Sequence, residues 1–408
     1  MTASPRPGFD VGQRRLLLFL SVATFFDGYD LVALAQLLPN IRADFGLDER
    51  QGGQLVSFVS LGTVAAYFLV RVADRIGRRR LLLVTIGGYT LFTVASGLAP
   101  GAVSFAVAQL LARVFLVAET ATAMVYAAEE LPARSRGFGL GVIQGSFSLG
   151  MVCGAVAVPL LLRTAPGWRS VYLVAAAPLV LLAFARWGLS ESRRFVAEGP
   201  RPARGSLLSL LRGPYRRRVL QLGVIWSCTY AGTQCAVSFW KEFALAERGL
   251  TDAQVGAAVG LSAILAMPAI FSVGALLDRL GRRAGGALVF CVEVVALVAT
   301  YSLHGLWPLT AALVFAVFGT GAVQVVLNAY TTELFPTPLR GDAFAWANAL
   351  IGRIGFVLAP LLVGHFAGSL GWGAAVRLTA AGPLIALVLI LAWFPETKAR
   401  ELEETSAL

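Results

Sequence analysis

The chain has 408 residues, of which 57% are hydrophobic and 14% are charged. Because a soluble globular protein carries about 25% charged residues, this composition excludes a soluble enzyme or a soluble binding module. The net charge of +11 is compatible with nucleic-acid binding, but the apolar segments leave no soluble domain to provide such an interface.

Apolar segments of about 20 residues, long enough to cross a hydrocarbon core of ~30 Å as helices, recur along the whole chain. Twelve membrane-spanning helices are predicted, at residues 16–38, 54–70, 81–98, 104–128, 137–162, 170–185, 219–243, 254–277, 284–302, 309–331, 343–364 and 372–393. The predicted fold class is therefore an all-α polytopic membrane protein.

Short motifs indicate that the last six helices repeat the first six. Asp-Arg-Ile-Gly-Arg-Arg at 74–79 returns 204 positions later as Asp-Arg-Leu-Gly-Arg-Arg at 278–283. The same spacing, to within one residue, separates Glu129 from Glu333 and Glu191 from Glu396. A constant offset indicates a duplicated half. Membrane proteins built from two parallel repeats place their substrate site between the repeats, near the bilayer midplane, so we expect a two-lobed transporter.

The predicted domains are a six-helix bundle at 1–189, a basic linker at 190–218 and a second six-helix bundle at 219–408. Most of the 34 Lys and Arg residues lie in the linker, in the two tails and in the loops on their side of the bundle. Because basic residues are retained on the cytoplasmic side of a membrane, both termini are expected in the cytoplasm and the helices in the inner membrane. The basic charge thus sets orientation and does not indicate a nucleic-acid partner.

No cofactor, metal or catalytic group is predicted. The four cysteines all fall within predicted helices, and the two histidines, His304 and His365, are far apart in the sequence. Since no Ser/His/Asp or metal-ligand spacing occurs, an enzyme is not expected.

Each repeated loop follows the second helix of its half. Gly77 permits a tight turn, and the arginines stand where lipid headgroups and helix C-terminal carbonyls attract cations. The arginines alone indicate anchoring at the membrane surface. The acid that precedes them in both halves favours a gate latch, in which Asp74 faces a helix N-terminus of the other half and holds one access state shut.

These motifs together resemble the major facilitator superfamily, and the resemblance covers nearly the whole chain. It rests on both repeated loops, on Glu129 to Gly137 with its counterpart Glu333 to Gly341, and on Pro395-Glu396-Thr397-Lys398. It implies the major facilitator fold of two parallel six-helix repeats, and transport by alternating access. The gate loops that it implies comprise Asp74, Arg75, Gly77, Arg78, Arg79, Glu129, Arg136, Asp278, Arg279, Gly281, Arg282, Glu333 and Arg340.

Within the superfamily, the end of the chain is similar to the branch that contains sugar porters, organic-ion transporters and aromatic-acid/proton symporters. Asp27-Gly28-Tyr29-Asp30 is most similar to the aromatic-acid group. One position departs from the family, which usually has a glycine four residues before the loop aspartate. Gly274 follows this pattern, whereas Val70 stands there in the first half. The close packing of the second helix against the other half, and with it the strength of the Asp74 latch, is therefore not assured.

Charged residues inside the predicted helices are functional candidates, because each costs about 2.5–3.5 kcal/mol at a helix centre on insertion scales. The candidates that lie away from the helix ends are Asp27, Asp30, Arg113, Glu119, Glu293 and Arg353. The positions related by the repeat to Asp27, Arg113, Glu119 and Arg353 hold Ala231, Val317, Val323 and Leu149. The duplicated architecture does not require these charges, and we interpret them as specialisations.

Asp27, Asp30 and Glu119 are the candidates for proton coupling. In the superfamily the first and fourth helices line the central cavity, so Asp27 and Arg113 could face each other there. A buried carboxylate beside a cation stays ionised, and it takes up a proton once the cation is engaged elsewhere. A substrate that competes for Arg113 would thus drive protonation of Asp27; the alternative is a fixed structural ion pair. Glu119 stands six positions after Arg113 on the same helix, so the two cannot both face the cavity squarely, and it is either a proton relay or a packing pair with another helix. A structural role is favoured for Glu293.

Arg353 resembles the arginine of the eleventh helix with which organic-anion transporters bind their substrates. A guanidinium offers a carboxylate a planar bidentate fork. The flanking Gly352 and Gly355 leave a helix-packing role open. The remaining candidates for substrate binding are Arg113, Gln144, Trp226, Tyr230, Gln324 and Asn328, although either aromatic residue alone is more typical of packing.

The sequence therefore predicts a secondary active transporter, monomeric in the lipid bilayer, that moves a small organic anion such as an aromatic carboxylate together with protons. Proton-coupled efflux of a drug or metabolite is the main alternative, because gradients and not topology set the direction of transport. A sugar porter is disfavoured, since two buried arginines are costly for a neutral substrate. A non-transporting membrane sensor is disfavoured because the short loops provide no domain to relay a signal.

Overall fold

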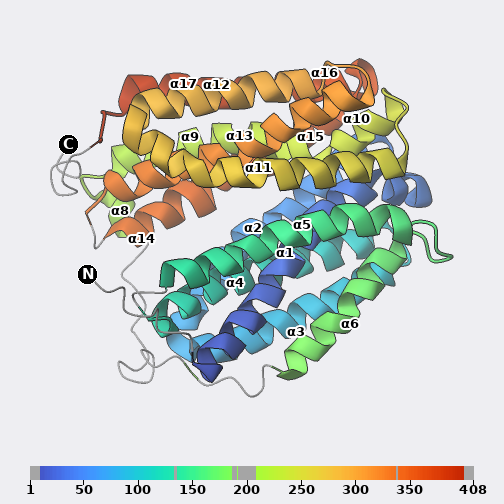
Figure 1. Ribbon diagram of the computed structural model, residues 1–408, viewed down its shortest axis with the longest axis horizontal. Coiled ribbons are helices and arrows are strands. Elements are labelled where there is room, and N and C mark those ends of the chain that lie inside the picture. Colours follow the sequence, from blue (N-terminus) through green and yellow to red (C-terminus); the bar gives the residue numbers. More distant parts are fainter. Residues whose placement is uncertain (1–9, 133–135, 186–190, 192–207, 337–338, 399–408) are drawn as a thin grey trace, which may run out of the picture.

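The computed structural model describes residues 10–132, 136–185, 191, 208–336 and 339–398, except for the side chains at 72–75, 136–137, 181, 183–185 and 208–209. Within these ranges every regular element is a helix (Figure 1). The first half contains α1 (Val11–Phe45), α2 (Glu49–Ile76), α3 (Arg78–Gly97), α4 (Ala102–Glu130), α5 (Arg136–Leu161) and α6 (Arg169–Ala185). The second half contains α8 (Leu208–Arg212), α9 (Arg216–Ser238), α10 (Trp240–Ala246), α11 (Asp252–Leu280), α12 (Arg282–Thr300), α13 (Leu306–Glu333), α14 (Arg340–Phe344), the π-helical segment η3 (Ala345–Gly352), α15 (Arg353–Leu370), α16 (Trp372–Leu378) and α17 (Ala381–Trp393).

Each predicted span coincides with one helix or with a short succession of helices, which confirms the all-α membrane architecture. In the described part of the chain, ten segments are long and apolar enough to cross a membrane. Of the remaining two, α6 is apolar but shorter. The other, α9, begins with three arginines and carries polar residues such as Thr229, Thr233 and Gln234, which lower its hydropathy.

Local sequence explains where the first helix and the two loop-following helices begin. The carboxylate of Asp10 accepts a hydrogen bond from the backbone N–H of Gln13, while the Gln13 side chain accepts one from the N–H of Asp10, a capping box that starts α1. α3 and α12 begin directly after Gly77 and Gly281, whose φ angles are 96° and 92°. Since a side chain is strained at such angles, glycine allows each loop to turn straight from one helix into the next.

The first and fifth helices of each half cross at a glycine. A Cβ atom on Gly150 would overlap the carbonyl oxygen of Phe25, and one on Gly355 would overlap the carbonyl oxygen of Ser227. Gly355 lies 205 positions after Gly150, so the repeat extends to the packing of the helices. The close approach of α15 to α9 also sets the position of Arg353, two residues before Gly355.

The two halves pack together through α2 with α15 and through α5 with α11. In Figure 1 their ribbons converge at the end where α1 meets α10, here the closed end, and separate toward the end that carries the repeated loops, here the loop end. Toward the closed end, the Ser57 hydroxyl donates to the carbonyl of Val357 at 2.5 Å. A Cβ on Gly53 would lie 2.7 Å from the Cα of Gly364.

The close packing that the resemblance implied at Gly274 does not occur in this arrangement. Among the described residues, no atom beyond its own helix lies within 4 Å of a Cβ built there. The reason is that Gly274 stands toward the loop end, where the halves have separated. The second helix of the first half makes its close contact at Gly53 instead.

Candidate functional site

The first half contributes two acids, the partly buried Asp27 and the buried Asp30, and one arginine to the middle of the bundle. Arg113 on α4 forms an ion pair with Asp30 on α1, with 3.2 Å between Nη2 and Oδ2, and both residues are less than a tenth exposed. Asp27 instead accepts a hydrogen bond of 2.9 Å from the hydroxyl of Thr120. The sequence predicted that Arg113 would face Asp27. Because α1 and α4 run in opposite directions, the later residue of α1 meets the earlier residue of α4, and Asp30 is the ion-pair partner.

The second half contributes a different arginine. The guanidinium carbon of Arg353 lies 4.6 Å from the ring centre of Tyr230 and 4.7 Å from that of Phe356. No carboxylate of the described residues lies within ion-pair distance of it. Asp27, from the other half, interacts electrostatically with both Arg113 and Arg353. Arg353 is therefore a half-buried cation held on aromatic rings, with an acid of the opposite half nearby.

The two interpretations of Arg353, packing and presentation to a ligand, are compatible. A Cβ on Gly352 would lie 2.8 Å from the Cβ of Trp226, and one on Gly355 would overlap the carbonyl of Ser227. The glycines provide the close packing against α9. The arginine between them lies over Tyr230 and does not fill the helix interface.

The other predicted binding residues occupy two kinds of position. Trp226 has no exposed surface and donates from Nε1 to the hydroxyl of Thr331 at 3.3 Å, which fits packing better than ligand contact. Gln144 on α5 and Gln324 and Asn328 on α13 are exposed, although both helices are apolar. Exposed amides on membrane-spanning helices suit a water-filled passage better than a lipid face.

The two remaining intramembrane acids lie between helices. Glu119 is 1% exposed, and its Oε2 accepts a hydrogen bond of 2.5 Å from Thr85 on α3, which fits the packing alternative. Glu293 on α12 has no exposed surface and lies against Gly319 of α13. In the described part of the chain, neither acid forms a hydrogen bond or an ion pair with Asp27, Asp30, Arg113 or Arg353.

Sequence reasoning missed three residues of this region. They are Thr120, which binds Asp27, Phe356, which lies beside Arg353, and Asn348, which donates a hydrogen bond of 2.9 Å to the Tyr230 hydroxyl. Thr120 and Phe356 stand seven and three residues from a singled-out arginine on the same helix. A search at helical spacing from Arg113 and Arg353 would have found them.

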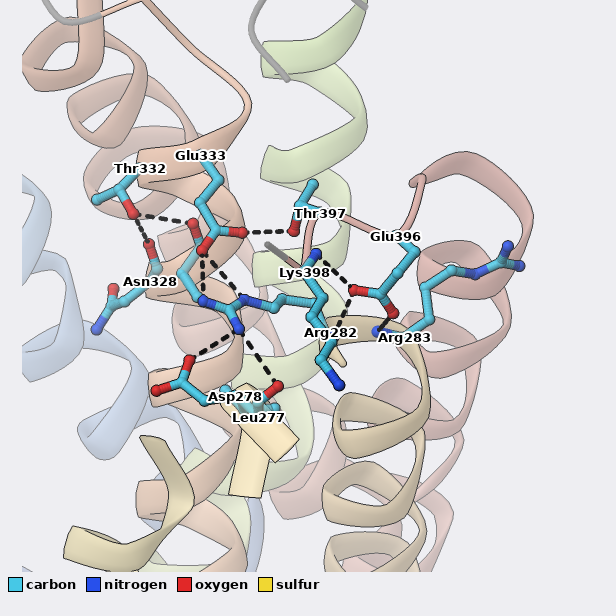
Figure 2. Close-up of polar contacts among 11 residues, drawn as sticks. Leu277, Asp278, Arg282, Arg283, Asn328, Thr332, Glu333, Glu396, Thr397 and Lys398 are labelled. Carbon is cyan, nitrogen blue, oxygen red and sulfur yellow. Dashed lines mark hydrogen bonds and ion pairs between the residues drawn. The ribbon is translucent and has the colours of Figure 1, made fainter. Parts of the chain in front are cut away.

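The repeated loop of the second half forms a compact ion cluster at the loop end (Figure 2). Arg282 contacts Glu333 at 3.0 Å and Asp278 at 2.9 Å, and the Thr397 hydroxyl donates to Glu333 at 2.5 Å. The carboxylate of Glu396 accepts the backbone N–H groups of Arg282 and Arg283 at 2.7 and 2.9 Å, so it caps the first turn of α12.

Backbone donors also set the ionisation of Glu396. Partial burial acts to raise its pKa, but the backbone N–H groups of Arg283 and Arg282, with those of Lys398 and Thr397, outweigh burial and hold the pKa below its ordinary value. A carboxylate at a helix N-terminus is favoured by the helix dipole as well. Glu396 is therefore ionised at neutral pH.

The first half repeats this cluster. Glu191 accepts the backbone N–H groups of Arg78 and Arg79 at 2.9 and 3.1 Å, and Arg78 pairs with Glu129 at 3.3 Å. The spacing shared by Glu191 and Glu396 thus corresponds to one structural role, the cap of the third helix in each half.

The gate latch across the halves stays a prediction. The side chains of Asp74, Arg75 and Arg136 lie outside the described residues. Of the described gate residues, Asp278 pairs within its own half, the backbone carbonyl of Arg279 accepts from Lys398 at 2.7 Å, and Arg340 donates to the carbonyl of Phe335 at 3.0 Å.

A second ion cluster, which sequence reasoning did not single out, joins the halves at the closed end. Arg42 of α1 contacts Glu242 of α10 and Glu49 of α2, each at 2.9 Å, and lies over the ring of Trp372 at 5.2 Å. The neighbouring Lys241 is buried; it contacts Asp252 at 2.5 Å and Asn40 of α1 at 3.2 Å. In the sequence, Arg42, Lys241 and Glu242 were marked only by their charge and by their place near the ends of two predicted spans, 16–38 and 219–243.

Comparisons with known proteins agree with this architecture. A sequence model of the Major Facilitator Superfamily matches residues 20–240 and 222–407. The chain is 24% identical to the putative niacin/nicotinamide transporter NiaP of Bacillus subtilis strain 168, over 96% of this chain and 98% of that protein. It is 26% identical to a gallate transporter of Pseudomonas putida, over 92% and 90% of the two chains. In structure it is similar to the inward-open xylose transporter XylE of E. coli, with a TM-score of 0.77, 18% identity and 97% and 99% coverage; this likeness concerns the fold alone.

Proposed function

Because the chain belongs to the Major Facilitator Superfamily, and is therefore a membrane transporter and not an enzyme, we propose that it carries a small organic anion of the aromatic carboxylate class by proton symport. One relative that matches over nearly its whole length is named for niacin and nicotinamide, and another is named for gallate. Niacin and gallate are both aromatic carboxylates. The proposal includes a monomer in the inner membrane with both termini in the cytoplasm, in keeping with the distribution of Lys and Arg.

The observation that carries the proposal is the environment of Arg353, which lies on two aromatic rings with no carboxylate of the described residues within ion-pair distance. A half-buried arginine without an acid in ion-pair contact is costly, because a charge in a low-dielectric surrounding needs a partner. A substrate carboxylate would supply that partner and bind the guanidinium edge bidentately. The rings of Tyr230 and Phe356 would lie beside the aromatic part of the same substrate. Arg113 is already engaged by Asp30, so we assign it to structure and Arg353 to the anion.

The proposed coupling uses Asp27, which feels the charge of Arg113 in its own half most strongly and also that of Arg353 from the opposite half. Once a substrate carboxylate binds Arg353, less positive charge is available to Asp27, and a carboxylate in such a surrounding takes up a proton. Substrate and proton would then be carried together. In this proposal the substrate carboxylate competes with Asp27 for the charge of Arg353, whereas the sequence had predicted that it competes for Arg113.

Substitution of Arg353 tests the assignment. Arg353→Ala removes a charge-assisted contact worth about 1.5–3 kcal/mol, so the apparent Km for niacin or gallate uptake should rise about 10- to 100-fold. Arg353→Lys should recover only part of the loss, because an ammonium lacks the planar fork. Arg169→Ala, which removes an arginine from the closed end, serves as the control. An unchanged Km in Arg353→Ala would remove this residue from the site.

A further inference from the structure

We propose that Asn348 is a positioning residue of the transport site. By holding the hydroxyl of Tyr230, it fixes the ring on which the Arg353 guanidinium lies, and so sets the direction in which the N–H groups of Arg353 meet a substrate carboxylate. This inference rests on the proposed role of Arg353 in anion binding, and it adds to that role a residue that does not itself touch the substrate.

The backbone around Asn348 places it for this task. Asn348 lies in η3, which is wound as a π-helix and runs directly into α15 at Arg353. Two residues five positions apart in a continuous α-helix would point about 140° away from each other. In a π-helix, residues five apart follow one another along the same side. The π-helical segment thereby turns Asn348 and Arg353 toward the same neighbour, Tyr230 of α9.

Tyr230 is held on three sides. Its hydroxyl accepts the hydrogen bond of Asn348 at 2.9 Å. Its ring lies 5.2 Å from that of Trp226 at an interplanar angle of 34°, and 5.5 Å from that of Phe356 at 90°. Both Asn348 and Tyr230 are buried, so the hydrogen bond is sheltered from water. Two rings at a right angle form a corner, and the guanidinium of Arg353 lies against both faces of that corner.

The orientation of the ring matters because of the shape of a guanidinium. A guanidinium is planar, it packs against an aromatic ring through its face, and it donates hydrogen bonds from its edge. The plane of the Tyr230 ring therefore restricts the direction in which the edge of Arg353 points. A ring that has lost its hydroxyl anchor keeps its hydrophobic contacts with Trp226 and Phe356 but gains freedom to tilt. The expected consequence is weaker anion binding with little change in the rate of the conformational cycle.

The test measures uptake of labelled niacin by the full-length protein in proteoliposomes. Asn348→Leu and Tyr230→Phe each remove one partner of the same hydrogen bond, and a net hydrogen bond of about 0.5–1.5 kcal/mol corresponds to a change of roughly three- to tenfold. Each variant should raise the apparent Km by that factor and leave the maximal rate unchanged. The double variant should show no larger rise than either single one, because both remove one and the same interaction.

Thr331→Val is the matched control. It removes the neighbouring buried hydrogen bond of the Trp226 indole but keeps the packing of the Trp226 ring against Tyr230 and the hydrogen bond of Asn348, so it should leave the Km unchanged. Tyr230→Phe removes a single oxygen atom, so it keeps the test decisive if Asn348→Leu folds poorly in a thermal-shift control.

Three results would overturn the proposal: an unchanged Km in both single variants, an equal rise in Thr331→Val, or additive rises in the double variant. Absence of any carboxylate uptake by the wild-type protein would instead contradict the proposed function, and this inference with it. Uptake by the wild type with an unchanged Km in the variants would contradict this inference alone.

Discussion

At the start of α12, Gly281 satisfies two constraints at once. Its backbone has φ 92° and ψ 163°, a region that is essentially restricted to glycine. A Cβ atom there would also lie 2.6 Å from Oε2 of Glu396, the carboxylate that caps the helix. The repeat-related Gly77 has φ 96° and ψ 154°, so the glycine of each repeated loop is required by backbone geometry.

Gly281→Ala should therefore destabilise the protein. The backbone conformation costs about 1–3 kcal/mol for a residue with a side chain, and displacement of Glu396 weakens the cap as well. The apparent melting temperature in detergent, read by tryptophan fluorescence or by a fluorogenic thiol-reactive dye that labels cysteines as they become exposed, should fall. Gly274→Ala is the control, since it lies in the interior of α11 with open space around it and alanine favours a helix by about 1 kcal/mol. An equal loss in both variants would show that the loop geometry is not the cause.

For single residues, the sequence identified most of the charged side chains of the candidate site but not the residues with which they pair. Asp27, Arg113 and Arg353 stand out because a charge within an apolar span is rare. The pairing of Arg113 with Asp30 depends on the register between α1 and α4, which no local pattern encodes. Asn348 was missed because a single amide in an apolar span is ordinary until its contact with Tyr230 is known.

Among the elements, α1, α2, α10 and α11 meet in the ion cluster of the closed end. Arg42 reaches from α1 to Glu242 of α10, and Lys241 of α10 reaches to Asn40 of α1. These contacts cross from one half to the other and are largely buried. A buried ion pair that loses one partner leaves the other uncompensated. The cluster should therefore favour the arrangement in which this end is closed.

Glu242→Gln should shift the equilibrium toward arrangements that open this end. The variant keeps the volume of the side chain and removes the charge, which weakens a contact worth about 1.5–3 kcal/mol. A cysteine introduced at Ser57, buried between α2 and α15, should react with a membrane-impermeant maleimide about tenfold faster or more. The four native cysteines are replaced beforehand.

Asp44→Asn provides the comparison for this prediction. Asp44 forms an ion pair of 2.8 Å with Arg169 within the first half, so its loss should leave the alkylation rate unchanged. The same rate in Glu242→Gln and in the parent protein would show that the cluster does not hold the closed end together.

The helices themselves could be predicted from the sequence, since apolar length alone determines which segments cross a bilayer. Their internal interruptions could not. The break between α9 and α10 and the π-helical segment before Arg353 fall inside single apolar runs. They depend on tertiary packing, namely the inter-half contacts of Lys241 and Glu242 and the fit of Gly352 and Gly355 against α9.

The whole molecule consists of two halves that are joined at one end and separated at the other (Figure 1). Arg353 belongs to the second half and Asp27 to the first half, and the two interact electrostatically across this division. A transporter that exposes its site to each side of the membrane in turn needs its substrate contacts shared between the two moving parts. An anion held by Arg353 and a proton held by Asp27 would meet that need, and the coupling between them is the central claim.

The measurement that tests this claim most directly is uptake of labelled niacin and gallate into proteoliposomes with an alkaline interior, with xylose as a neutral comparison and Asp27→Asn alongside the wild type. We predict that the wild type accumulates at least one carboxylate, that an uncoupler abolishes the accumulation, and that xylose is not taken up. Asp27→Asn should lose accumulation but retain part of the exchange in counterflow, because it still binds the anion. Full accumulation by Asp27→Asn, or accumulation by the wild type that survives the uncoupler, would contradict the account.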